Sequence, residues 1–175
     1  MKHILILLFL LTAVLPSSTQ ADQAVALDLL LGEGDLTGLR LAYRPYHLPV
    51  GSIDWLGEVE VYFEFSANFW EYGADNHHDT NLALALSPVI SQQFTTLYGR
   101  PLKWEFGIGV SLVEDTRFAG KDIGSHYQFE DRLGLVLVLE DQESVTMRYM
   151  HYSNGGLNDN NPGMDFLNLS YALRF

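Results

Sequence analysis

The chain has 175 residues, no cysteine, and 22 acidic against 10 basic side chains, which gives a formal net charge of −12. The lack of cysteine excludes disulfide bonds and thiolate metal sites, and so large an acidic excess argues against nucleic acid as a partner. Hydrophobic residues make up 47% of the chain and aromatic residues 13%. This composition excludes a disordered chain and favours one folded domain.

The first 21 residues predict a secretory signal peptide. Lys2 places a charge before an apolar block that runs from Ile4 to Leu15, and small residues follow as far as Ala21. The block is shorter than the ~20 residues that a membrane-spanning helix needs. We therefore expect cleavage after Ala21 and a mature domain of residues 22–175, with a net charge of −13 because Lys2 is lost and no acid with it.

Apolar and polar residues alternate with a period of two along much of the mature chain, and the clearest case runs from Glu58 to Phe69. Its apolar positions are Val59, Val61, Phe63, Phe65, Ala67 and Phe69, and its polar positions include three glutamates. Because successive side chains of a strand point to opposite faces, this pattern predicts a long strand with one apolar face.

Seven further segments of about ten residues behave in the same way, and turns or polar loops separate them. The eight predicted strands are Ala24–Leu31, Leu36–Arg44, Glu58–Phe69, Asn81–Ile90, Leu102–Val113, Phe129–Leu139, Ser144–Ser153 and Asp165–Phe175. The fold class is therefore all-β, with no linker that would divide the chain into domains.

Two architectures fit these strands. A soluble sandwich or lipocalin-like barrel turns the apolar faces inward, whereas an outer-membrane barrel turns them toward lipid and keeps polar side chains in the lumen. Arg132, Arg148 and Arg174 offer luminal partners for the glutamates. The last strand alternates apolar residues and stops on Phe175, which resembles the C-terminal signature of bacterial outer-membrane barrels. We predict an eight-stranded antiparallel transmembrane β-barrel.

A histidine, a serine and an aspartate share the apolar parity of the last two strands. His151 and Ser153 end one strand and Asp165 begins the next, so all three are expected at one rim and on the outer wall. One interpretation is that they only mark the water-exposed end of a hairpin. The other is a hydrolytic triad, with a nucleophile, a base and an acid, whose position would face membrane lipid.

The chain resembles the lipid A 3-O-deacylases of Gram-negative outer membranes (the PagL type). The resemblance is strongest over His151-Tyr152-Ser153-Asn154-Gly155-Gly156-Leu157. It extends upstream through Ile108-Gly109-Val110, Thr116-Arg117 and Phe129-Glu130-Asp131-Arg132-Leu133-Gly134. The N-terminal half agrees only in architecture.

The resemblance implies an outer-membrane esterase that removes the acyl chain at the 3-position of lipid A, with Ser153 as nucleophile and His151 as general base. The third member of the family's triad is a glutamate fourteen residues after the histidine, and Asp165 stands there in this chain, one methylene shorter. Asn154 is expected to donate to the oxyanion, with the backbone N–H groups of Gly155 or Gly156 as further donors. The resemblance implies lipid A and outer-membrane lipid as partners and no cofactor.

The remaining candidate residues give weaker evidence for a function. His77-His78-Asp79 lies in a polar loop without a third metal ligand at a recognisable spacing, so no metal site is expected. Lipid A carries phosphates, and the cations that could approach a rim are Arg40, Arg44, Arg100, Arg117 and Lys121. Two rival functions stay open, a non-enzymatic structural or binding barrel and a phospholipase or acyltransferase on the same scaffold. The oligomeric state, a homodimer included, is also open.

Overall fold

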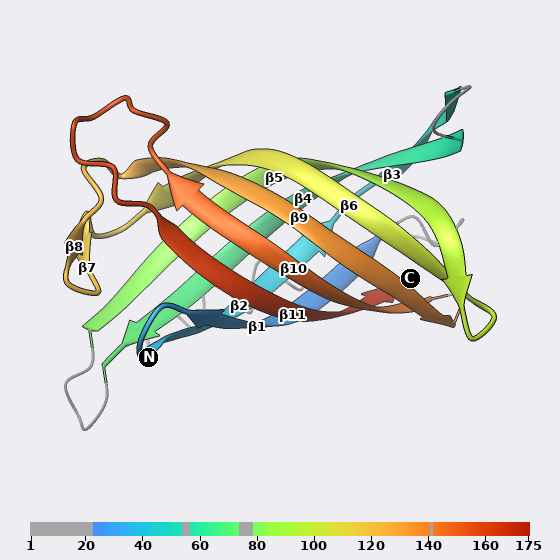
Figure 1. Cartoon of the computed structure of the whole chain (residues 1–175), viewed down its shortest axis with the longest axis horizontal. Coiled ribbons are helices and arrows are strands. Elements are labelled where there is room, and N and C mark those ends of the chain that lie inside the picture. The colour runs from blue at the N-terminus through green and yellow to red at the C-terminus, as the bar shows by residue number, and fades with distance from the viewer. Residues whose placement is uncertain (1–22, 54–56, 74–78, 141) are drawn as a thin grey trace.

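A computed structural model describes residues 23–53, 57–73, 79–140 and 142–175. The expected signal peptide lies outside the described residues. Figure 1 shows long, tilted strands that curve around a common axis, with the longer loops gathered at one end of the molecule. No helix in these ranges is long and apolar enough to span a membrane.

Eight strand positions close the barrel, and every neighbouring pair is antiparallel. In chain order they are β1 (Ala24–Gly32), β2 (Leu36–Arg44), β4 (Gly57–Tyr72), β5 (Asp79–Leu97), β6 (Arg100–Val113), β9 (Tyr127–Glu140), β10 (Glu143–Ser153) and β11 (Met164–Arg174). Strand β1 pairs with β11 and with β2, and β2 pairs with β4, so the sheet returns on itself. Closure pairs the backbone groups of both would-be edges, which a chain in lipid requires.

Besides the two-residue strands β7 (Arg117–Phe118) and β8 (Lys121–Asp122), one strand of the barrel wall was not predicted from the sequence. Strand β3 (His47–Ile53) follows β2 after a break at Pro45 and Tyr46, and both β2 and β3 pair with β4. Pro49 and Gly51 interrupt its alternation, so its residues do not show the period of two. Because β3 continues the path of β2 along β4, the number of strands around the barrel stays at eight.

The predicted alternation is confirmed, with apolar side chains outside and polar ones within. On β11, Leu167, Leu169, Tyr171 and Leu173 are 40–52% exposed, while Asn168 and Ser170 between them are at most 1% exposed. The other strands repeat this arrangement, with Leu27, Leu29 and Leu31 exposed on β1 around the fully buried Asp28. A soluble barrel would bury the leucines instead, so the structure has the inverted faces of a barrel in lipid.

The lumen is filled by a network of balanced charge, here called the ionic network. Its members are Asp28, Glu64, Glu105, Glu130, Arg40, Arg44, Arg132 and Arg148, none more than 5% exposed. Glu64 accepts hydrogen bonds from Arg40 at 2.6 Å, from Arg44 at 2.7 Å and from Arg132. Four carboxylates face four guanidinium groups, so each buried charge has partners close by.

Above the ionic network, toward the longer loops, the lumen is closed by an apolar plug. It contains Leu30, Leu36, Trp70, Ala83, Val113, Phe118, Ile123, Met150, Tyr152, Met164 and Phe166. The ring of Trp70 meets those of Tyr152 and Phe166, with centroids 4.9 and 5.2 Å apart. The hydroxyl of Tyr152 donates to Glu130 at 2.7 Å, which joins the plug to the ionic network.

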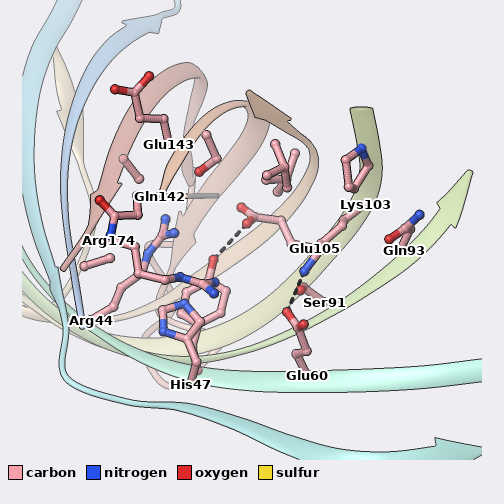
Figure 2. A pocket seen from close by; sticks show the side chains of 17 residues that line it. Arg44, His47, Glu60, Ser91, Gln93, Lys103, Glu105, Gln142, Glu143 and Arg174 are labelled. Atoms are coloured by element: carbon pink, nitrogen blue, oxygen red, sulfur yellow. Dashed lines mark hydrogen bonds and ion pairs between the residues drawn. The ribbon is translucent and has the colours of Figure 1, made fainter. Parts of the chain in front are cut away.

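A polar cavity of about 260 Å³ opens at the other end of the barrel (Figure 2). Arg44 and His47 line it on one side, and on another Lys103 donates to Glu60 at 2.7 Å. The turn between β5 and β6 lies at this end, and the loop between β10 and β11 lies at the opposite one (Figure 1). The cavity is therefore remote from the residues that the sequence predicts to be catalytic.

We expect Glu64→Gln to lower the free energy of unfolding by about 3–5 kcal/mol, because three arginines would lose a buried anion. Glu60→Gln is the matched control, since Glu60 pairs with Lys103 at a partly exposed mouth and its loss should stay within about 1 kcal/mol. Urea unfolding of the barrel in detergent micelles measures both. Equal midpoints for the two variants would contradict the importance of the ionic network.

Candidate active site

The candidate residues lie on the outer wall at the loop end of β9, β10 and β11. His151 pairs in register with Asp165 on β11 and with Asp131 on β9, so the three form one row across the wall. The next row toward the membrane centre is Leu133, Tyr149 and Leu167, each more than half exposed. A polar row thus borders directly on a lipid-facing apolar surface.

His151 and Asp165 are joined by a hydrogen bond of 2.6 Å between His151 Nδ1 and Asp165 Oδ1. Both side chains are about one third exposed, at 35% and 32%. A carboxylate on Nδ1 favours the tautomer with its proton there and leaves Nε2 free to accept a proton. The cross-strand register therefore orients the imidazole with Nε2 available to accept a proton.

Ser153 is half-buried and lies two residues beyond His151 on the same face of β10, opposite Phe129 on β9. Across the described residues, no hydrogen bond joins the serine hydroxyl to His151. Catalytic hydrogen bonds are often long before substrate binds, so this spacing is compatible with a nucleophile and its base. The structure brings all three predicted residues to one rim, with the base bonded to the acid.

Gly163, which the sequence did not single out, fixes the other edge of the imidazole. A Cβ added at this glycine would lie 2.7 Å from His151 Cε1, which is closer than van der Waals contact allows. Its φ of 69° is in the left-handed region, where glycine is favoured. The carbonyl of Gly163 also accepts a hydrogen bond from Lys121 at 3.3 Å, which ties it to the β7–β8 hairpin (Arg117–Phe118 and Lys121–Asp122).

The loop between the two strands, residues 154–163, is organised around Asn154. Its side-chain amide is fully buried and donates to the carbonyls of Ile123 at 3.1 Å and Asn160 at 2.7 Å. Its Oδ1 accepts from Gly156 N at 3.0 Å, and its backbone N–H donates to Asn161 Oδ1 at 2.9 Å. Both amide hydrogens that the sequence analysis offered to an oxyanion are therefore engaged in holding this loop.

The basic residues considered for the rim separate into three groups. Arg40 lies in the lumen, so its expected approach to a rim is wrong, and Arg44 lies beside the cavity at the end of the barrel opposite the site. Arg100 begins β6 at the end of the barrel opposite the site. Arg117 and Lys121 lie on the β7–β8 hairpin at the site end, where Lys121 pairs with Glu33 at 2.8 Å.

Alternate side chains of the segment Phe129-Glu130-Asp131-Arg132 point to opposite faces of β9, as its strand parity predicts. Glu130 and Arg132 pair with each other inside the barrel, as luminal charge partners. Asp131 points outward beside His151. Its position in the row with His151 and Asp165, here called the catalytic row after the predicted roles of those two residues, could have been predicted from parity, because odd-numbered residues of β9 face outward together with Leu133.

Metal ligands do not gather at this rim or elsewhere in the part of the chain that the structure describes, where no three acidic or histidine side chains are placed to hold an ion. His77 and His78 lie outside the described residues, and Asp79 begins β5.

The family model for lipid A 3-O-deacylase (PagL) matches residues 37–174, which is most of the barrel. The chain belongs to this family. It is 33% identical over 119 residues to the lipid A deacylase PagL of Bordetella bronchiseptica, which covers 68% of this chain and 65% of that protein. With the lipid A deacylase PagL of Pseudomonas aeruginosa it shares 33% identity over 117 residues, 67% of this chain and 66% of that one.

The chain thus spans slightly less than two thirds of the length of these relatives. A crystal structure of the outer membrane enzyme PagL superposes with a TM-score of 0.72 and 26% identity, over 87% of this chain and 99% of the other. The fold of this PagL-family member is therefore that of an outer-membrane β-barrel. This likeness to a solved outer-membrane enzyme confirms the membrane architecture predicted from strand parity.

We expect Gly163→Ala to lower by at least about tenfold any turnover that depends on His151, because the new methyl group would displace the imidazole and small misplacements are costly in catalysis. Gly120→Ala is the matched control, with a φ of 72° and open space around its Cα, so it bears similar backbone strain without the clash. Turnover and thermal midpoint are measured for both. Equal activity losses would contradict the contact.

Proposed function

We propose that this protein is an outer-membrane esterase that hydrolyses the ester-linked hydroxyacyl chain at the 3-position of lipid A. The observation that carries the proposal is the His151–Asp165 hydrogen bond on the lipid-facing wall, with Ser153 on the same face of β10. Membership of the PagL family and the name of its relatives, lipid A deacylase, support the same substrate.

In the proposed mechanism, Ser153 Oγ attacks the ester carbonyl while His151 Nε2 takes the hydroxyl proton. Collapse of the tetrahedral intermediate breaks the ester bond, and His151 returns the proton to the departing sugar hydroxyl. A water molecule, deprotonated by His151, then attacks the acyl-enzyme and releases the hydroxy fatty acid. Asp165 holds the imidazole and stabilises its charged form during both steps, and no cofactor enters.

The oxyanion of each tetrahedral intermediate requires hydrogen-bond donors next to Ser153. We assign them to the backbone N–H groups of Gly155 and Gly156 in the loop that follows. Asn154 takes a positioning role in this proposal, because its buried amide holds the loop and its Oδ1 occupies Gly156 N. Donation by Gly156 requires that this bond be exchanged for one to the substrate.

The acyl chain of the substrate has a matching surface directly below the catalytic row. Leu133, Tyr149 and Leu167 form the adjacent outward row, and Leu135, Met147 and Leu169 form the one after it. These side chains are 45–59% exposed and apolar, so an acyl chain within the outer leaflet lies against them while its ester reaches Ser153. The position of the site on the wall thus suits a substrate that is itself a membrane lipid.

The decisive experiment incubates detergent-folded protein with purified lipid A and follows the lipid by mass spectrometry. We expect the wild type to remove one hydroxyacyl chain, and Ser153→Ala and His151→Ala to remove none while they keep a folded, heat-modifiable barrel. Both residues face outward from the luminal ionic network, so the barrel should not depend on them.

Intact lipid A with a folded wild type would refute the proposal and favour a structural or binding barrel. Release of fatty acid from phospholipid instead, or transfer of the chain to an added acyl acceptor, would assign a phospholipase or an acyltransferase. Loss of the barrel in either variant would make Ser153 or His151 structural.

The two carboxylates beside His151 should differ in importance. We expect Asp165→Asn to reduce kcat at least about a hundredfold, because an amide favours the wrong imidazole tautomer and cannot balance the imidazolium charge. Asp131→Asn should change kcat by less than about threefold, since Asp131 neighbours His151 in register without a described hydrogen bond to it. Steady-state kinetics on both variants test this, and an equal loss would mean that the acid is misassigned.

A further inference from the structure

Asp165 accepts a second hydrogen bond that the catalytic mechanism above does not use. Tyr149 Oη donates to Asp165 Oδ1 at 2.5 Å, and His151 Nδ1 reaches the same oxygen at 2.6 Å. Tyr149 pairs in register with Leu167, so it approaches Asp165 diagonally from one row deeper in the membrane wall. A diagonal cross-strand pair is within reach of a tyrosine.

The surroundings of Tyr149 direct its hydroxyl toward the site. Its neighbours in its own row are Leu133 and Leu167, which offer no hydrogen-bond partner, and the ring itself is 53% exposed on the lipid-facing wall. A phenol buried in an acyl-chain layer needs a partner for its hydroxyl, and Asp165 is the one within reach.

Asp165 in turn needs such a donor. Its carboxylate lies at the boundary between the loops and the apolar wall, one third exposed, where water can satisfy only part of it. By the resemblance described above, the family carries a glutamate at this position, so this chain holds its imidazole with an acid one methylene shorter. A short carboxylate held only by the imidazole keeps other rotamers open, whereas two donors on one oxygen select a single orientation.

We infer that Tyr149 is a positioning residue for the catalytic acid, holding Asp165 in the orientation that binds His151 and compensating for the shorter side chain. The inference rests on the proposed function, because it assigns Asp165 to the triad. Tyr149 touches no reacting atom in this scheme and acts through Asp165 alone.

The test compares Tyr149→Phe with the wild type, since phenylalanine keeps the ring in the membrane wall and removes only the hydroxyl. We expect kcat on lipid A to fall about tenfold, as for loss of one hydrogen bond to a charged group, with KM within twofold of the wild-type value. Tyr171→Phe is the matched control, because Tyr171 also faces lipid on β11 but lies toward the other end of the barrel, and it should be unchanged.

A rescue experiment separates this role from a general structural one. Asp165→Glu restores the longer side chain, so we expect that variant to be active and the double variant Tyr149→Phe/Asp165→Glu to match it within twofold. The same tenfold loss in the Asp165→Glu background would overturn the inference. So would an inactive Asp165→Glu, an unchanged kcat in Tyr149→Phe, or a rise in KM alone, which would make Tyr149 a substrate contact.

An NMR measurement that needs no substrate tests the role of Tyr149 separately from the proposed deacylase activity. In protein labelled with ¹⁵N-histidine, the Nδ1 proton of His151 should resonate far downfield and be identified by its loss in His151→Ala. Tyr149→Phe should move it upfield as the carboxylate loses its orientation. An unmoved resonance would refute the positioning role even if the wild type deacylates lipid A, and a shifted one would support it even if lipid A is not the substrate.

Discussion

The structure depends on one constraint: every strand of a closed barrel in lipid must present alternate residues to two opposite environments. The outer residues dissolve in the acyl-chain layer, and the inner ones must satisfy one another in a narrow lumen. Here the four acids and four arginines of the ionic network neutralise one another in the lumen. Their ion pairs join β1, β2, β4, β6, β9 and β10 across the barrel. Four of the chain's ten basic residues are held there, away from the rim that carries the candidate site.

The same alternation gives the candidate site its support. His151 and Ser153 point outward, and the residues between and beside them, Met150 and Tyr152, point into the apolar plug at 0% and 1% exposure. Phe166 does the same next to Asp165. Each outward side chain of the candidate site is therefore flanked along its own strand by a buried, inward-pointing residue. A site on the outer wall of a barrel can be rigid for this reason, although no second layer of protein covers it.

The loop end adds what the strands cannot supply. The strands place the histidine, the serine and the aspartate, and the loop of residues 154–163 returns over them so that Gly163 meets the imidazole. Asn154 ties that loop to Ile123, so the long loop between β6 and β9 and the loop between β10 and β11 support each other. On the membrane side, Tyr149 lies one row deeper in the wall and donates a hydrogen bond to Asp165. The imidazole of His151 is thus contacted by the Asp165 carboxylate and by Gly163 of the loop, and the carboxylate is contacted in turn by Tyr149 of the wall.

The sequence by itself determined the fold class, the strand positions and the side to which each residue points, because a period of two is a local property of the chain. That was enough to place His151, Ser153 and Asp165 on one outer rim and Arg132 inside. Strand β3 was missed because Pro45, Pro49 and Gly51 break the local pattern. Only the tertiary structure decided which side chains meet, since register and closure act between distant segments. Arg148 reaches Asp28 across 120 residues of sequence, Asn154 serves the loop rather than offering free donors, and Tyr149 finds Asp165, none of which a local pattern can encode.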